Sequence, residues 1–221
     1  MTDQDEHGKT LGVILAGGLS RRMEGPEKSL MTLDGKPLIS RAYERLKVQI
    51  GEIIINANGD GTRFEFMGKP VQADTVEGFA GPLAGVLAGM IWAKANRQDC
   101  QRVISIPADT PFFPTDLVER FEAELRGLPE EEQDQAICLA YSDGNRHPVF
   151  GSWPIALAEE LENFLVKENE RKVMLFVQRF TLIKVDFPMH IANDETLDPF
   201  FNINTQADLK RAEQIIETNP L

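Results

Sequence analysis

Residues 11–28 read LGVILAGGLSRRMEGPEK, and this stretch decides how the chain is organised. The apolar run at 11–15 has the length of a buried strand, and it stops at Gly17 and Gly18. Glycine has no Cβ atom, so it lets backbone N–H groups come close to a ligand. The stretch therefore predicts a buried strand that runs into a glycine-rich loop.

Strands and helices alternate through the rest of the sequence. Hydrophobic patterns predict further strands at residues 52–56, 71–74, 102–106, 135–141, 147–151 and 181–186. They predict helices at residues 38–50, 81–95, 115–126, 154–166, 171–180 and 206–217, with an acidic loop at 130–132. Strands separated by helices imply an α/β fold with three layers, in which helices cover both faces of a mostly parallel sheet. Ligands bind at the carboxyl ends of such strands.

The sequence contains no internal repeat, low-complexity tract or linker. We therefore expect a single domain over residues 11–221. Residues 1–10 are polar and acidic and lack the basic start and apolar core of a signal peptide. We expect them to form a flexible tail.

Composition excludes several classes of partner. The formal net charge is −12, which disfavours nucleic acids and anionic membranes, although a local basic site can still bind a small anion. No run approaches the ~18–20 apolar residues of a membrane span. The two cysteines, Cys100 and Cys138, form no CxxC motif, so we expect neither a disulfide framework nor a zinc site. These features predict a cytoplasmic protein.

The glycine-rich loop carries the chemistry of a phosphate site. A concave row of backbone N–H groups suits a triphosphate, and the loop adds a hydroxyl and three cations at Ser20, Arg21, Arg22 and Lys28. A Walker A loop requires Gly-Lys-Ser/Thr, but Glu27 precedes Lys28 here. The two adjacent glycines do not supply the GxGxxG of a dinucleotide fingerprint either. The loop thus predicts phosphate binding of another kind.

Polar residues also stand at other strand ends. Asp109 follows a predicted strand, where a carboxylate can hold a hard cation or close an Asx turn. Asn56 and Asp74 can read a base or a ribose, or act as turn residues. In residues 81–89, GPLAGVLAG, the glycines allow close approach to a ligand or tight helix packing. His147 is assigned no catalytic role, because no nucleophile is evident beside it.

The motif LAGGLSRRM…EK resembles the signature LAGGxSxRMG…DK of the MobA family of molybdenum cofactor guanylyltransferases. The glycine-rich start alone marks only a wider group, which includes sugar-phosphate and cytidylyl nucleotidyltransferases. The resemblance continues in order from residue 11 to about residue 209, through Asn56 in IIINAN, Asp74, GPLAG at 81–85, Asp109-Thr-Pro, His147-Pro148 and NINT at 202–205. This combination is much more specific than the loop.

The resemblance implies a Rossmann-like nucleotidyltransferase fold and the transfer of GMP from GTP to the terminal phosphate of molybdopterin, with Mg²⁺ as cofactor. It implies that the N-terminal half binds the nucleotide, through Leu15, Ala16, Gly17, Gly18, Lys28, Asn56, Asp74, Gly81 and Asp109. The catalytic residues are then Arg22, Lys28 and Asp109, with Asp109 as the metal ligand. The C-terminal half holds molybdopterin, through Arg171, Lys172, Asn202 and Asn204 together with Arg22 of the N-terminal half. Molybdenum-insertion proteins and molybdoenzyme chaperones are further partners that it suggests.

Three points leave alternatives open. Arg171 and Lys172 can equally be an exposed helix start. Glu24 replaces a glycine usual in the family, so a nucleotide-binding regulator without catalysis remains an alternative. Cytidylyl relatives more often carry LAAG where this chain has LAGG, which favours GTP over CTP, but a molybdopterin cytidylyltransferase or a sugar-phosphate nucleotidyltransferase also remains open.

Overall fold

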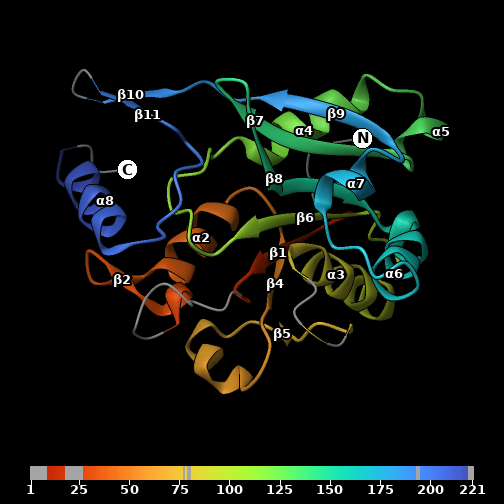
Figure 1. Ribbon diagram of the computed structural model, residues 1–221, viewed down its shortest axis with the longest axis horizontal. Coiled ribbons are helices and arrows are strands. Elements are labelled where there is room, and N and C mark those ends of the chain that lie inside the picture. The colour runs from red at the N-terminus through yellow and green to blue at the C-terminus, as the bar shows by residue number, and fades with distance from the viewer. Residues whose placement is uncertain (1–8, 18–26, 77, 79–80, 193–194, 219–221) are drawn as a thin grey trace.

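The computed structural model describes residues 9–17, 27–76, 78, 81–192 and 195–218. Seven strands form one sheet in the order β5-β4-β1-β6-β8-β7-β9 (Figure 1). Their bounds are β1 (Thr10–Leu15), β4 (Glu52–Asn56), β5 (Val71–Gln72), β6 (Arg102–Pro107), β7 (Ala136–Ser142), β8 (Asn145–Pro154) and β9 (Thr181–Asp186). β8 runs antiparallel to its neighbours β6 and β7, and the other neighbouring pairs are parallel. The predicted mostly parallel sheet is confirmed.

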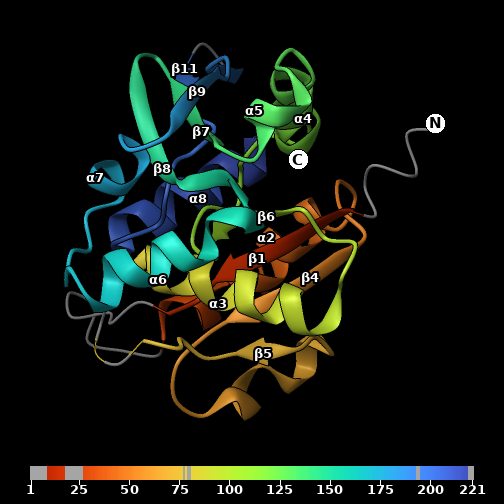
Figure 2. The ribbon, with the colours of Figure 1, turned by 90° about the vertical axis from the view of Figure 1, so that its right-hand side faces the viewer.

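Helices cover both faces of this sheet (Figures 1 and 2). One face packs against α3 (Pro82–Asn96), α6 (Ala158–Val166) and α7 (Val173–Val177), and the other packs against α2 (Leu38–Leu46) and α4 (Leu117–Arg126). Successive residues of a strand point to opposite faces. In β1, accordingly, Val13 joins the core under α3, whereas Ile14 joins the core under α2. The three-layer arrangement is therefore confirmed.

A third, smaller core joins segments from distant parts of the chain. It packs α8 (Gln206–Thr218) near the β2 (Thr32–Leu33) and β3 (Lys36–Pro37) hairpin. Its buried residues are Met31, Leu33, Leu38, Phe112, Leu197, Ile203 and Ala212. Leu197 ends β11 (Glu195–Leu197), which pairs with β10 (His190–Ala192). The small core brings the NINT segment beside residues that follow the glycine-rich loop.

Several local elements differ from the predictions. The acidic loop was a wrong prediction, because α5 (Glu130–Gln133) is a short helix with three glutamates in its first turn, where negative charge favours a helix. The helix predicted at 171–180 is limited to α7, and the helix predicted from 154 begins with a 3-10 turn, η4 (Ile155–Leu157). The 3-10 helices η2 (Lys28–Leu30) and η3 (Gly61–Met67) were not predicted.

The β2–β3 hairpin turns at Asp34 and Gly35, which both have positive φ angles, 49° and 72°. Asp-Gly favours such a turn, because a two-residue hairpin loop of this kind needs positive φ at both positions. This dipeptide was a signal that the sequence analysis did not use.

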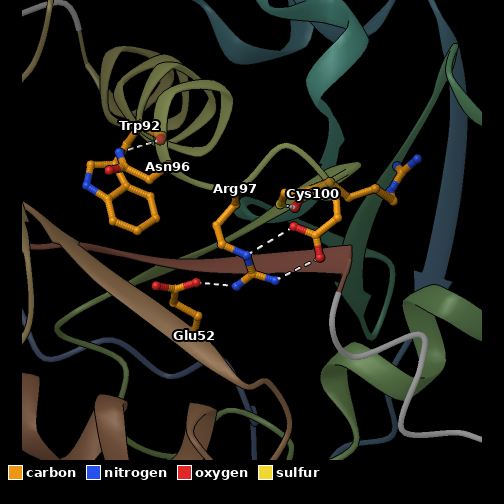
Figure 3. A network of polar contacts seen from close by, with 7 residues as sticks. Glu52, Trp92, Asn96, Arg97 and Cys100 are labelled. Carbon is orange, nitrogen blue, oxygen red and sulfur yellow. Dashed lines mark hydrogen bonds and ion pairs between the residues drawn. The ribbon is translucent and has the colours of Figure 1, made fainter.

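The loop after α3 is fastened at the amino end of the sheet, as Figure 3 shows. Arg97 donates two hydrogen bonds of 3.2 Å to Asp99 and pairs with Glu52, the first residue of β4. The bonds to Asp99 and then to Glu52 raise the pKa of Arg97. Asn96 donates to the carbonyl of Trp92 at 2.8 Å. This network lies at the opposite end of β4 from Asn56. Nowhere in the ranges described is there a helix long and apolar enough to cross a membrane.

Candidate functional site

A pocket of about 250 Å³ opens where β1, β4 and β6 end. The register of the sheet aligns Leu15 with Asn56 on one side and with Pro107 on the other. Two backbone hydrogen bonds continue the pairing past the strand ends, from Ala16 N to the Asn56 carbonyl at 2.9 Å and from Ala108 N to the Leu15 carbonyl at 3.0 Å. The pocket therefore has the position that the sequence predicts.

The predicted nucleotide-binding residues that are described all line this pocket. They are Leu15, Ala16, Gly17, Lys28, Asn56, Asp74, Gly81 and Asp109. Gly18 and Arg22, which were also predicted as site residues, lie outside the described residues. The geometry thus gathers residues from the ends of β1, β4 and β6, from the segment after β5, and from the starts of η2 and α3.

Lys28 and Asp109 meet on the wall of the pocket. The Nζ atom of Lys28 pairs with Oδ2 of Asp109 and donates a hydrogen bond to Oδ1 of Asn204. Both charged side chains are shielded, with exposed fractions of 18% for Lys28 and 23% for Asp109. The Thr110 hydroxyl donates to the other Asp109 oxygen at 3.3 Å. A cation and a carboxylate are therefore held together at the end of β6.

Asp74 is held by two asparagines. Asn56 Nδ2 donates to Asp74 Oδ1 at 2.9 Å, and Asn58 Nδ2 donates to Asp74 Oδ2 at 2.7 Å. The backbone N–H of Asp74 donates in return to Asn58 Oδ1 at 2.9 Å. Asn56 lines the pocket, whereas Asn58 is not among the residues that line it. Asn58 therefore holds the Asp74 carboxylate in place without lining the pocket itself, a role that motif alignment alone did not assign to it.

The glycines of GPLAGVLAG have different surroundings. Gly81 precedes α3 with a φ of 73°, a conformation that favours glycine, and Pro82 occupies the first turn of the helix. A Cβ atom at Gly85 would overlap the side chain of Asn56, and one at Gly89 would lie 2.5 Å from Val13 Cγ2. Gly89 thus serves helix packing on the sheet, while Gly85 also makes room for a residue of the pocket.

The residues predicted for the C-terminal half lie around the pocket rather than in it. Asn202 and Asn204 are exposed on either side of the buried Ile203. The backbone N–H of Ile203 donates to the Asp109 carbonyl at 3.0 Å and fastens this segment beside the pocket. None of Arg171, Lys172, Asn202 and Asn204 is among the described residues that line it.

Arg171 lies near the segment that leads into α3. A Cβ atom at Gly78 would be 3.8 Å from Arg171 Nη2, and one at Gly81 would be 4.0 Å from the Arg171 carbonyl oxygen. Glu170 accepts hydrogen bonds from the backbone N–H groups of Arg171 at 2.8 Å and Lys172 at 3.2 Å. The turn before α7 is therefore fixed next to the pocket edge.

The sequence analysis missed five residues that line the pocket, namely Ser29, Pro82, Pro107, Ala108 and Val149. Ser29 is 3% exposed, and its hydroxyl has no hydrogen-bond partner in the part of the chain described. Its only sequence signal was adjacency to Lys28. Val149 comes from β8, where the Ser105 hydroxyl donates to its carbonyl at 2.6 Å, and no local pattern indicated it.

His147 belongs to a network outside the pocket. Its Nε2 atom lies 2.6 Å from the Ser142 hydroxyl, which donates to Asp198 at 2.9 Å. The imidazole stacks on Phe200 with 4.4 Å between ring centroids, and burial lowers the pKa of His147, although Asp198 acts in the opposite direction. A serine hydroxyl that donates to a carboxylate is not an activated nucleophile, so this trio fastens β7 and β8 to the segment before NINT.

Comparisons with known proteins agree with this geometry. A sequence profile for the MobA-like NTP transferase domain matches residues 12–180. A molybdenum cofactor guanylyltransferase from Mesorhizobium japonicum is 44% identical over 207 residues, which cover 94% of this chain and 96% of that protein. A relative of the same name from Rhizobium meliloti is 40% identical over 201 residues, which cover 91% of this chain and 89% of that protein.

Solved structures support the fold. Molybdopterin-guanine dinucleotide biosynthesis protein A from Archaeoglobus fulgidus aligns with a TM-score of 0.66 at 24% identity, covering 94% of this chain and 98% of that one. CMP:2-keto-3-deoxy-manno-octonic acid synthetase, solved with CTP, aligns with a TM-score of 0.67 at 14% identity, covering 95% and 98%. The predicted Rossmann-like nucleotidyltransferase fold is confirmed.

Proposed function

The chain belongs to the MobA-like family of molybdenum cofactor guanylyltransferases, which are nucleotidyltransferases, and from this premise we propose that it transfers GMP from GTP to molybdopterin. The acceptor is the terminal phosphate of molybdopterin, and pyrophosphate is released. One observation carries the proposal: the shielded Lys28–Asp109 pair stands in the same pocket as Asn56 and Asp74. A cation and a carboxylate suit a triphosphate, and the amide and carboxylate suit a nucleoside.

In this proposal, different residues of the pocket bind the triphosphate and the nucleoside of GTP. Gly17 and Lys28 face the triphosphate, because a backbone N–H and a point charge bind phosphate oxygens. Asn56 and Asp74 face the base or the ribose with acceptor oxygens that other protein groups already orient, because both N–H groups of the Asn56 amide donate to Gln72 and Asp74. Gly18 and Arg22 complete the phosphate side in this proposal.

The donor set at Asp109 fits magnesium. Magnesium is usually bound by one or two carboxylates together with substrate phosphates and water. Asp109 offers one carboxylate in the pocket, and the described residues contain no group of three or more His, Cys, Asp or Glu side chains that would form an all-protein metal site. Asp109 would therefore hold Mg²⁺ jointly with the nucleotide. When bound, the ion supplies positive charge that offsets the charge developing on phosphate oxygens.

The reaction needs no nucleophile from the protein. An oxygen of the terminal phosphate of molybdopterin forms a bond with the α-phosphorus of GTP, while the bond from that phosphorus to the β-phosphate breaks and pyrophosphate leaves with the electron pair. The protein's part is to align the two phosphates and to neutralise charge. Lys28 would serve the second task with its ammonium group, which contacts Asp109 and Asn204 in the described structure.

The second substrate is proposed to lie on the Asn204 side of Lys28. Asn202 and Asn204 present exposed amides there, and Asn204 already contacts Lys28. Exposed amides can bind the polar ring of a pterin. Arg171, Lys172 and Arg22 would meet its phosphate, since cations bind phosphate oxygens.

A competition assay tests the proposal. Purified protein is mixed with Mg²⁺, molybdopterin and equal concentrations of GTP and CTP, and the product is identified by mass. A GMP adduct together with pyrophosphate is the expected result. A CMP adduct would keep the mechanism but replace the base, and tight GTP binding without any adduct would contradict nucleotidyl transfer.

A further inference from the structure

Arg63 connects two stretches of chain that border the pocket. Its Nε and Nη2 atoms pair with the two carboxylate oxygens of Glu27, the second contact measuring 3.2 Å. Nη2 also donates to the carbonyl oxygen of Asn58 at 2.8 Å, and Nη1 donates to the carbonyl oxygen of Asp60. The planar guanidinium thus joins one carboxylate to two backbone carbonyls, a pattern that lysine cannot reproduce.

The position of Arg63 is itself fixed. Its guanidinium carbon lies 4.6 Å from the centroid of the fully buried Phe64 ring. Asp60 caps η3 by accepting a hydrogen bond of 3.0 Å from the backbone of Thr62. Only 24% of the Arg63 side chain and 23% of the Glu27 side chain are exposed. Solvent therefore screens this pair less than an ordinary surface salt bridge.

Both ends of the connection lead to pocket residues. Glu27 directly precedes Lys28, and its carbonyl oxygen accepts a hydrogen bond of 2.9 Å from Leu30 N, which closes the turn carrying Lys28. At the other end, Asn58 holds Asp74 through two hydrogen bonds. Arg63 and Glu27 are not among the described residues that line the pocket. Their influence on a bound nucleotide must therefore pass through neighbouring pocket residues, and Lys28 is the one directly bonded to Glu27 in sequence.

The ion pair between Arg63 and Glu27 also affects the charge near Lys28. A carboxylate attracts an ammonium group, and Glu27 is adjacent to the phosphate-side lysine, so a released Glu27 would compete with the nucleotide for Lys28. Arg63 neutralises this carboxylate and holds both of its oxygens. We propose that Arg63 is a positioning residue for nucleotidyl transfer, which fixes the place of Lys28 by holding Glu27 against the Asn58 segment. The inference rests on the proposed function, because it assigns Lys28 to the triphosphate.

A double-mutant cycle with Lys28 tests the inference. Wild type, Arg63→Ala, Lys28→Ala and the double variant are compared by kcat/KM for GTP, by GTP affinity without molybdopterin, and by thermal unfolding. Arg97→Ala is the matched control, since Arg97 also pairs with a glutamate and is partly shielded but lies at the opposite end of β4 (Figure 3). Arg63→Lys keeps the positive charge but loses the planar set of donors of the guanidinium group, and it replaces Arg63→Ala in the cycle if the alanine variant does not fold.

We expect Arg63→Ala to lower kcat/KM for GTP by about tenfold, and Arg63→Lys by less, whereas Arg97→Ala should change it by less than about twofold. In the Lys28→Ala background, the Arg63 substitutions should cost less than about twofold, because their effect passes through Lys28. The inference is overturned if the Arg63 variants lower kcat/KM for GTP no more than Arg97→Ala does. It is also overturned if the Arg63 substitutions lower kcat/KM as much in the Lys28→Ala background as in wild type. Neither result would bear on the transferase activity of the wild-type protein. A wild-type protein that binds GTP but forms no adduct would instead overturn the proposed function and, with it, this inference.

Discussion

The side chain of Asn56 packs directly against the backbone of Gly85. A Cβ atom at residue 85 would lie 2.8 Å from Asn56 Cγ and 2.5 Å from Leu15 Cδ2. Asn56 is 4% exposed and donates to both Asp74 and the Gln72 carbonyl, so it has little freedom to move aside. The close approach of α3 to β1 and β4 therefore decides how the amide of Asn56 is presented to the pocket.

Gly85→Ala is predicted to weaken GTP binding, and Gly89→Ala is its control. Both substitutions overpack the contact of α3 with the sheet, and we expect each to cost roughly 1–3 kcal/mol in the free energy of unfolding. Only the new methyl group at residue 85 meets a pocket residue, whereas the one at residue 89 meets Val13. Urea unfolding and GTP titration check this. Equal GTP affinities for the two folded variants would contradict it.

Asp109→Ala is predicted to abolish turnover, and Lys28→Ala to impair it severely. Loss of one charge-stabilising contact in an active site typically costs about 10²–10³ in rate. Lys47→Ala is the control, because Lys47 forms a salt bridge with Glu44 on the exposed side of α2. Pyrophosphate release is measured at several Mg²⁺ concentrations and after chelation. Near-wild-type rates for both Asp109→Ala and Lys28→Ala would contradict the proposed roles.

Ser29→Ala is predicted to leave the ligand-free protein as stable as wild type or more stable. A buried hydroxyl without a partner carries a desolvation cost that its removal relieves. Ser105→Ala is the matched control, because the Ser105 hydroxyl donates to Val149 and accepts from Trp153 at 2.8 Å. Ser105→Ala should lower the free energy of unfolding by roughly 1–3 kcal/mol. Thermal unfolding of the ligand-free proteins measures both, and a clear loss of stability in Ser29→Ala would refute the prediction.

Removing His147 is predicted to reduce the acid sensitivity of folding. Burial lowers the pKa of His147 below its ordinary value of 6.5, so in a pH window just below 6.5 the unfolded chain binds this proton more readily than the folded protein does. The contribution of neutral His147 is thus fully present above pH 6.5 and is lost as pH falls through its folded pKa. Between about pH 7.5 and about pH 5.5, His147→Gln should lose less unfolding free energy than wild type in urea titrations. If the unfolding free energy of His147→Gln depended on pH as that of wild type does, the prediction would be wrong.

Local patterns in the sequence determined the architecture and the place of the pocket. The strands that end at Leu15 and Asn56 are apolar runs of strand length, and their boundaries follow from burial on both faces of the sheet. Parallel strands end on the same side, so the residues that follow them meet. That argument is sufficient to bring Asn56, Asp74 and Asp109 to one edge of the sheet, and the described structure has them there. Lys28 does not follow a strand end directly, and its place in the site was implied by the glycine-rich motif and the family resemblance.

Tertiary structure alone decided which side chains touch. Lys28 and Asn204 are 176 positions apart, and Arg63 and Glu27 are 36 apart. Periodicity reports only which face of its own element a residue occupies, so it carries no information about such partners. The room for Asn56 beside Gly85 and the contribution of Val149 likewise depend on how α3 and β8 pack on their neighbours. Contacts of this kind are set by close packing of whole elements, which no single stretch of sequence specifies.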